Sequence, residues 1–229
     1  KKNNYIKNYI YFFHGAVSST KVYTDTAFDN YDKILCNGDY HVNEIECREK
    51  LLNLNKKELI KSGYFYFDYL NLKLNKNTLN DEILIAPSWN KNKENFINNK
   101  FEDIIQSTIQ AGYKVRFRPH PENLKRSIKY LENIKKKFKN KNFIFDDNPE
   151  NYLAFEKAKC LITDTSGIAI EFLLLLKRPV LYFDDFDKIH NNQLEKYKDL
   201  GIMEDKIKMQ FGNSFKENEI QNLNEILEN

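Results

Sequence analysis

Short runs of apolar and β-branched residues alternate with stretches of helical spacing over most of the chain. The runs predict strands at residues 83–86, 114–117, 143–145, 160–163 and 180–183. The stretches between them predict helices at residues 96–109, 124–138, 152–158 and 168–176. Strands that alternate with helices predict right-handed βαβ units and a parallel sheet that is covered on both faces. The expected fold class is therefore α/β, with a Rossmann-type domain in the second part of the chain.

The first part of the chain predicts a smaller α/β region. Residues 9–13 predict a strand that ends at His14-Gly15, and residues 34–36 predict a second strand, followed by a helix at residues 42–54. An aromatic stretch at residues 64–70 follows, and the chain is then rich in Asn and Lys to about residue 80. We expect a partial Rossmann-like domain with its linker at residues 1–78, and a second Rossmann-like domain at residues 79–229.

Composition narrows the class of protein. The chain has 229 residues, of which 41% are hydrophobic, enough to bury a core. Its 36 basic and 33 acidic residues leave a net charge of only +3, which argues against a dedicated nucleic-acid binder. The longest apolar runs are far shorter than the ~20 residues of a membrane span. The first residue is Lys1, with no initiator Met, so we expect a piece of a longer chain.

The number and spacing of the cysteines indicate the cellular compartment of the protein. Cys36, Cys47 and Cys160 form an odd set with no CxxC spacing. This pattern argues against a disulfide framework and against a structural zinc site. We therefore expect a reducing, cytoplasmic compartment.

One candidate binding element is Arg118-Pro119-His120-Pro121, which follows the strand at residues 114–117. In an open parallel sheet, ligands bind beyond the carboxyl ends of the strands. Proline fixes its own φ and restricts the residue before it, so Arg118 and His120 are expected in extended geometry. A guanidinium beside an imidazole predicts a phosphate clamp. The alternative is a rigid loop with an incidental His and solvated arginines.

A second candidate element is Thr163-Asp164-Thr165-Ser166-Gly167, between a strand and a helix. Backbone amides and the helix dipole favour an anion at a helix start, and Thr165 and Ser166 add hydroxyl donors beside Gly167. Ordinary N-capping explains the same residue types equally well. The absence of GxGxxG and GxxxxGK[ST] patterns argues against NAD and P-loop chemistry.

The remaining candidates from the sequence are single residues. His14 ends a strand in the first region and is a candidate general base, although a lone His there is at least as often structural. Asp25, Asp29 or Asp32 is a candidate to orient its imidazole. Glu171, in the helix after Gly167, could reach a nucleotide ribose. Ser88, at another strand end, is a candidate nucleotide or phosphate ligand.

The order of these elements resembles the CDP-glycerol glycerophosphotransferase family of teichoic-acid glycerol-phosphate primases and polymerases. The resemblance covers roughly residues 9–185 and includes the segments His14-Gly15, Gly63 to Asp68, Pro87-Ser88-Trp89, Arg118-Pro119-His120-Pro121, Asp164-Thr165-Ser166 with Glu171, and Lys177-Arg178-Pro179. The chain departs from the family pattern at Gly167, where a second Ser is common, and at residues 16–21.

The resemblance implies a GT-B arrangement of two Rossmann-like domains, with the acceptor side in the first and the CDP-glycerol donor mainly in the second. It implies that His14 is the base, that His120 and Ser166 hold the diphosphate, and that no metal or other cofactor is needed. The implied partners are a cytidine nucleotide donor and a polymer or lipid-linked acceptor.

We weigh three hypotheses. The first is transfer of glycerol phosphate to a hydroxyl, with release of CMP and with charge stabilised by Arg118, His120, Thr165 and Ser166. The second is a GT-B glycosyltransferase that uses a CMP- or UDP-activated sugar for capsule or lipopolysaccharide synthesis. The third is a nucleotide-binding fragment without activity of its own. The lysines at residues 135–137 predict a solvated helix end or, alternatively, peripheral contact with an anionic membrane at its inner face.

Overall fold

The computed structural model describes residues 5–78, 82–89, 99–139, 142–185 and 189–228. The chain divides into two units, Lys1–Tyr69 with Ile189–Ile207, and Leu70–Lys188 with Lys208–Asn229. This division differs from the expected boundary at residue 78, because Ile189–Ile207 belongs to the first unit. The reason is long-range packing: Asn191 donates to the carbonyl oxygen of Thr20 at 2.9 Å.

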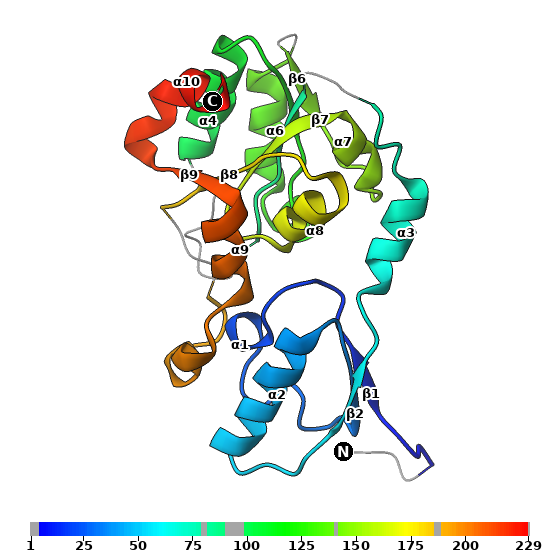
Figure 1. Ribbon diagram of the computed structural model, residues 1–229. Coiled ribbons are helices and arrows are strands. Elements are labelled where there is room, and N and C mark those ends of the chain that lie inside the picture. The colour runs from blue at the N-terminus through cyan, green and yellow to red at the C-terminus, as the bar shows by residue number, and fades with distance from the viewer. Residues whose placement is uncertain (1–4, 79–81, 90–98, 140–141, 186–188, 229) are drawn as a thin grey trace. The chain divides into compact units, whose positions relative to one another are not determined.

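The second unit is built on a six-stranded parallel sheet (Figure 1). Its strands lie in the order β6-β5-β4-β7-β8-β9. They are β4 (Glu82–Ile85), β5 (Lys114–Phe117), β6 (Phe143–Phe145), β7 (Ala158–Thr163), β8 (Val180–Phe183) and β9 (Gly212–Phe215). The chain runs outward from β4 to β6, then returns to place β7 on the other side of β4. The strand order therefore reverses between β4 and β7.

Helices cover this sheet, and their apolar side chains form the core together with those of the strands. The helices are α4 (Asn99–Gln110), α5 (Pro121–Arg126), α6 (Ile128–Lys137), α7 (Tyr152–Lys157), α8 (Gly167–Leu176), η2 (Glu217–Asn222) and α10 (Leu223–Glu228). Side chains of β4, β5 and β7, such as Ile85, Phe117 and Ile162, are fully buried against apolar residues of α4 and α6. Burial on both faces explains why these strands are continuous apolar runs in the sequence.

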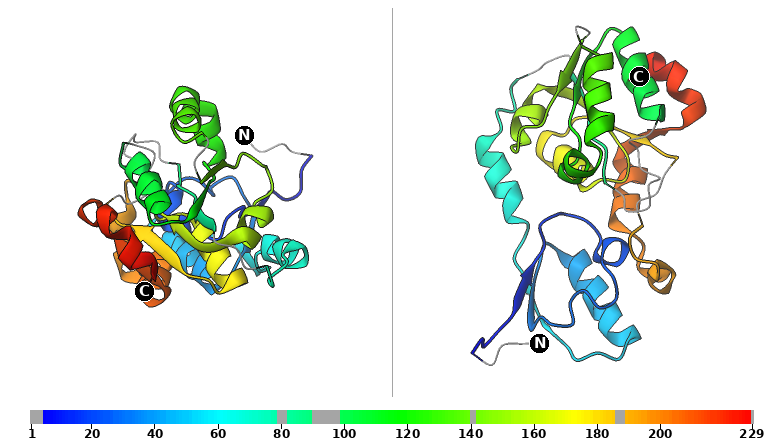
Figure 2. Two further views of the ribbon diagram at one scale, coloured as in Figure 1. Left: turned by 90° about the horizontal axis from the view of Figure 1, so that it is seen from above. Right: turned by 180° about the vertical axis from the view of Figure 1, so that it is seen from behind.

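The first unit contains a three-stranded parallel sheet, in the order β1-β2-β3, with α2 beside it (Figure 2). Its elements are β1 (Ile10–Phe12), α1 (Ser19–Val22), β2 (Lys33–Cys36), α2 (Asp39–Leu51), β3 (Glu58–Lys61) and η1 (Leu194–Leu200). The core consists of Phe13, Phe28, Ile34, Cys36 and Ile45. The helices α3 (Phe65–Lys73) and α9 (Met203–Phe211) span two of the three chain boundaries between the units.

The five strands predicted in the second part of the chain are confirmed, but two strands were not predicted. β3 is a mostly exposed strand with a charged residue at each end, and β9 has the sequence Gly-Asn-Ser-Phe. Both therefore lack the apolar run that marks a strand. β9 nevertheless pairs with β8, and a Cβ at Gly212 would clash with the ring of Tyr182, so only glycine fits there.

One helix prediction is corrected by the structure, and the first residues of another, 96–98, lie outside the described residues. The helix expected at residues 124–138 is divided into α5 and α6 at Ser127, which ends one and begins the other. α5 also starts earlier than expected, at Pro121, because proline is well accepted in the first turn of a helix. The expected helix at residues 96–109 begins at Asn99 in the described part of the chain.

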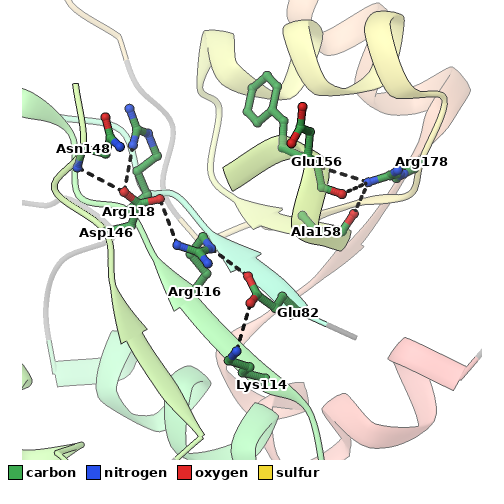
Figure 3. A network of polar contacts seen from close by, with 10 residues as sticks. Glu82, Lys114, Arg116, Arg118, Asp146, Asn148, Glu156, Ala158 and Arg178 are labelled. Atoms are coloured by element: carbon green, nitrogen blue, oxygen red, sulfur yellow. Dashed lines mark hydrogen bonds and ion pairs between the residues drawn. The ribbon is translucent and has the colours of Figure 1, made fainter. Parts of the chain in front are cut away.

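Arg178 joins two parts of the second unit. Its Nη1 donates to the carbonyl oxygens of Phe155, Glu156 and Ala158 at 3.0, 2.9 and 2.7 Å (Figure 3). Its Nη2 donates to the carbonyl oxygen of Thr78 at 2.9 Å. The guanidinium thus satisfies carbonyls at the end of α7 and fixes the chain that leads to β4.

Candidate functional site

The ends of β4 and β7 meet where the strand order reverses, which is the place where open α/β sheets bind ligands. Ser88, after β4, donates its N–H and its hydroxyl to the carboxylate of Asp164, after β7, at 2.9 and 2.5 Å. The hydroxyl of Thr163 donates to the carbonyl oxygen of Ala86 at 2.6 Å. Ser88, Thr163 and Asp164 are buried. These bonds fix the two loops against each other.

Ser88 was expected at a nucleotide or phosphate. Its side chain is fully buried, and both of its donors face Asp164. A phosphate needs donors, so this geometry favours a framework role, while a direct ligand contact by Ser88 stays a prediction.

Asn123, in α5, is part of the same network and was missed by the sequence analysis. Its Nδ2 donates to the carbonyl oxygen of Ser88 at 3.3 Å, and its backbone N–H donates to that of His120 at 2.8 Å. The side chain is fully buried. Asn123 therefore connects the loop after β5 to the loop after β4. One polar residue in a charged helix gives no sequence signal for such a contact.

His120 is presented by the start of α5. It is the N-cap residue, and its Nδ1 accepts a hydrogen bond from the N–H of Glu122 at 3.1 Å. A ring nitrogen that accepts carries no proton, so the proton of the neutral imidazole is on Nε2. The side chain is partly exposed. His120 thus has the tautomer that donates from Nε2, as contact with an anionic oxygen requires.

Arg118 is held by the loop after β6. Its Nη1 lies 3.2 Å from Oδ1 of Asp146, and its Nη2 donates to the carbonyl oxygen of Pro149 at 3.3 Å. Asp146 also pairs with Arg116 at 3.5 Å, and Arg116 pairs with Glu82 at 2.7 Å (Figure 3). The alternative of a solvated arginine is wrong in this structure, because the Arg118 side chain is only 13% exposed. Asp146 was another residue missed by the sequence analysis.

The start of α8 is open to an anion. Ser166 is its N-cap residue but makes no side-chain capping hydrogen bond, and the Asp164 carboxylate accepts from Ser88. Capping by the Ser166 side chain therefore does not explain this residue. Thr165, Ser166 and Gly167 are partly exposed. The amide groups of the first turn and the helix dipole favour an anion at this point.

Glu171 lies deeper along α8. The side chain is buried, and its Oε2 accepts from Nδ2 of Asn151 at 3.2 Å. Asn151 is the N-cap residue of α7. The bond orients the carboxylate, and the expected contact with a ribose stays a prediction.

In the first unit, His14 is exposed directly after β1. The carboxylates considered as its partners are engaged elsewhere. Asp25 accepts from the Tyr197 hydroxyl at 2.8 Å and Asp29 pairs with Arg48 at 2.5 Å. Asp32 accepts from a backbone N–H at 2.9 Å. The catalytic role of His14 and its approach to the phosphate site stay predictions.

A different histidine, His41, lies at 0% exposure in α2. Its Nδ1 accepts from the N–H of Asn37 at 3.3 Å, and its Nε2 lies 2.8 Å from the carbonyl oxygen of Val17. A ring that accepts at one nitrogen and donates at the other is neutral. Burial lowers the pKa of His41 from 6.5 to about 4.

We expect His41 to make the protein less stable as the pH falls from about 6.5 to about 4. In this window the unfolded chain binds the proton first, so the free energy of unfolding falls by up to about 1.4 kcal/mol per pH unit. The contribution is complete above pH 6.5 and is lost as the pH falls through the folded-state pKa. Burial raises the pKa of Glu44 and Glu204, and their protonation acts in the opposite sense.

The measurement is therefore a comparison with His41→Gln, which leaves the two carboxyl groups in place. Denaturant unfolding of both proteins gives the difference in free energy at each pH. That difference should shrink between pH 7 and pH 4. A difference that stays constant across this range would contradict the neutral, buried state of His41.

In the described part of the chain, no group of three or more His, Cys, Asp or Glu side chains is arranged to hold a metal ion. The three cysteines are free. No helix among the described residues is long and apolar enough to span a bilayer.

Solved structures with a similar fold include a wall teichoic acid polymerase, TagF. One TagF structure has 17% identity and a TM-score of 0.57 and aligns over 97% of this chain and 59% of its own. A second has 17% identity and a TM-score of 0.58, over 100% and 60%. The UDP-GlcNAc 2-epimerase of Methanocaldococcus jannaschii, in complex with UDP-GlcNAc and UDP, has 15% identity and a TM-score of 0.53, over 87% and 54%.

These similarities confirm the expected α/β class with GT-B-like, Rossmann-type folds. The chain spans less than two thirds of the length of the TagF structures. No curated protein matches it. The sequence pattern of the CDP-glycerol:poly(glycerophosphate) glycerophosphotransferase family matches residues 19–219. Because this match covers most of the chain, the protein belongs to that family.

Proposed function

We propose that the protein transfers glycerol phosphate from CDP-glycerol to a hydroxyl group of a cell-surface polymer. The acceptor oxygen attacks the β-phosphorus and forms a phosphodiester bond. The bond from that phosphorus to the bridging oxygen breaks, and CMP leaves with the bond's electron pair. His14 takes the proton of the acceptor hydroxyl. Family membership and the geometry of the switch point between β4 and β7 support this reaction.

The observation that carries the proposal is the convergence of three strand ends in the second unit. Ser88 and Asp164 join the loops after β4 and β7, and Asn123 joins the loop that carries His120 to them. The uncapped start of α8 belongs to the same edge. A diphosphate would meet backbone amides and a preset imidazole donor on a scaffold fixed by buried hydrogen bonds.

The proposed roles follow from these positions. Nε2–H of His120, the hydroxyls of Thr165 and Ser166 and the amide of Gly167 would donate to the diphosphate, and charge on the leaving CMP would be stabilised there. Arg118 would add positive charge that Asp146 partly offsets. Glu171 would contact the ribose. His120 is proposed as a catalytic residue because its Nε2–H would contact the leaving group.

The remaining expectations concern the binding partners and the cellular location of the protein. We propose a cytidine nucleotide donor, a polymer or lipid-linked acceptor, no cofactor, and a cytoplasmic enzyme at the inner face of the membrane. Membrane contact through the lysines has limited support, because Lys135 pairs with Glu132 at 3.3 Å and Lys137 pairs with Glu102.

Nucleotide binding without turnover is a second candidate. It is favoured by the share of the TagF structures that the chain spans, 59% and 60%, and by a sheet of three strands in the described part of the first unit. A glycosyltransferase that uses an activated sugar is the third.

Product analysis separates the three. The protein is incubated with CDP-glycerol labelled in its glycerol and a synthetic lipid that carries one glycerol phosphate unit, and CMP and labelled lipid are quantified. The proposal predicts one CMP for each phosphodiester formed. CMP or CDP binding with neither product would support the binding module. A glycosidic product from a CMP- or UDP-sugar, with no transfer from CDP-glycerol, would support the glycosyltransferase.

A further inference from the structure

The turn that carries His14 is held by side chains from the ends of two other strands. The Tyr64 hydroxyl donates to the carbonyl oxygen of His14 at 3.0 Å. Nδ2 of Asn37 donates to the carbonyl oxygen of Gly15 at 3.1 Å. We propose that Tyr64 and Asn37 are positioning residues for His14, a role that rests on the proposed function of His14 as the base.

The placement of the two residues fits this role. Asn37 directly follows β2, the neighbour of β1, whereas Tyr64 comes after β3, two strands from β1 and so about 10 Å away. A tyrosine is long enough to cover that distance. Gly63 has a φ of 74°, which only glycine adopts easily, and it turns the chain so that Tyr64 is buried at 7% exposure. Positioning of the turn that carries His14 is thus a role for the Gly63 to Asp68 segment, which is not part of the proposed donor site.

The rest of the segment is fixed in the same way. Residues 14–17 belong to no helix or strand, so their backbone groups need other partners. Nε2 of His41 donates to the carbonyl oxygen of Val17 at 2.8 Å, and the Glu44 carboxylate accepts from the N–H and hydroxyl of Ser19, both at 2.6 Å. Side chains thus hold this backbone from its first residue to the start of α1.

Such fixing is required because the His14 side chain is exposed. The backbone fixes the position of its Cα and the direction of the Cα–Cβ bond from which the imidazole extends. A displacement of about 1 Å at a reacting group can lower a rate by about 10²-fold. Loss of one hydrogen bond to the turn should act on the chemical step and leave nucleotide binding, which we place in the other unit, unaffected.

The test uses Tyr64→Phe, which removes one oxygen and keeps the ring. Tyr5→Phe, at a tyrosine that is 96% exposed, is the matched control. We expect kcat to fall about tenfold and KM for CDP-glycerol to change less than about twofold. We also expect the ¹⁵N order parameter of the Gly15 amide to fall from about 0.85 towards about 0.6. A partly unfolded population would also lower the apparent kcat at constant KM, so the order parameter, which reports on the folded protein, separates positioning from a general loss of stability.

Asn37→Ala gives a second, independent variant and should have the same two effects. Unchanged kcat and unchanged order in both variants would overturn the positioning role while leaving the proposed function intact. The order parameter does not depend on turnover. If the order parameter falls in the variants although the protein shows no transfer at all, the side chains hold the turn as proposed. In that case it is the proposed function of the site that is wrong.

Discussion

Replacing His14 by alanine is expected to lower the rate of glycerol-phosphate transfer by about 10²- to 10⁴-fold and to leave the affinity for CMP unchanged. The rate falls because a positioned general base contributes an effect of this size. The affinity is retained because His14 belongs to the first unit, whereas the proposed nucleotide contacts are in the second. His14 is exposed, so its removal leaves no cavity and the fold should persist.

Initial-rate kinetics and calorimetric titration with CMP measure the two quantities. Lys7→Ala, at another exposed residue of the first unit, serves as the control and should leave both unchanged. Near-native transfer by His14→Ala would rule out His14 as the base. Loss of CMP affinity would mean that His14 contributes to donor binding.

Replacing Asp164 by alanine is expected to lower the free energy of unfolding by about 2–4 kcal/mol and to abolish nucleotide binding. Asp164 accepts both donors of the buried Ser88, and each donor left without a partner costs about 1–3 kcal/mol. The loops after β4 and β7 would then separate at the point where the nucleotide is proposed to bind. Stability and binding should therefore fall together.

Denaturant unfolding and CMP titration measure the two effects, with Asp103→Ala, at an exposed aspartate of α4, as the control. Asp164→Asn should lie between the wild type and Asp164→Ala, because an amide oxygen accepts from Ser88 while its NH₂ group opposes the second donor. If Asp164→Ala were as stable as Asp103→Ala, the Ser88–Asp164 contact would not hold the switch point.

Much of the fold follows from the sequence because strands of the second sheet are buried on both faces. Phe143–Phe145 and Val180–Phe183 are apolar throughout and could be located to the residue. β3 and β9 could not, because short, polar or charged strands carry no such signal and form through pairing with a neighbour. The return of Ile189–Ile207 to the first unit depends on long-range contacts such as the bond between Asn191 and Thr20.

The candidate site was predictable only in part, for a similar reason. Arg118 directly follows β5, and His120 and Ser166 lie shortly after β5 and β7, so their place at the carboxyl edge follows from the order of elements. The residues that hold them in place could not be predicted from the order of elements. Asp146 lies in the loop after β6 and Asn123 in α5, and Tyr64 follows a strand, β3, that the sequence did not predict. Residues that act by orienting another residue become visible only when the chain is folded.

The claim at the centre of this account is that a cytidine nucleotide binds at the switch point, against His120. Calorimetric titration with CMP and UDP of the wild type and of His120→Asn tests it most directly. Asparagine is a good N-cap residue, so α5 is kept while the imidazole donor is lost. We predict that the wild type binds CMP and not UDP, and that His120→Asn binds CMP at least about tenfold more weakly, as expected for a hydrogen bond to a charged group. Binding of neither nucleotide, or CMP binding that His120→Asn leaves unchanged, would contradict the account.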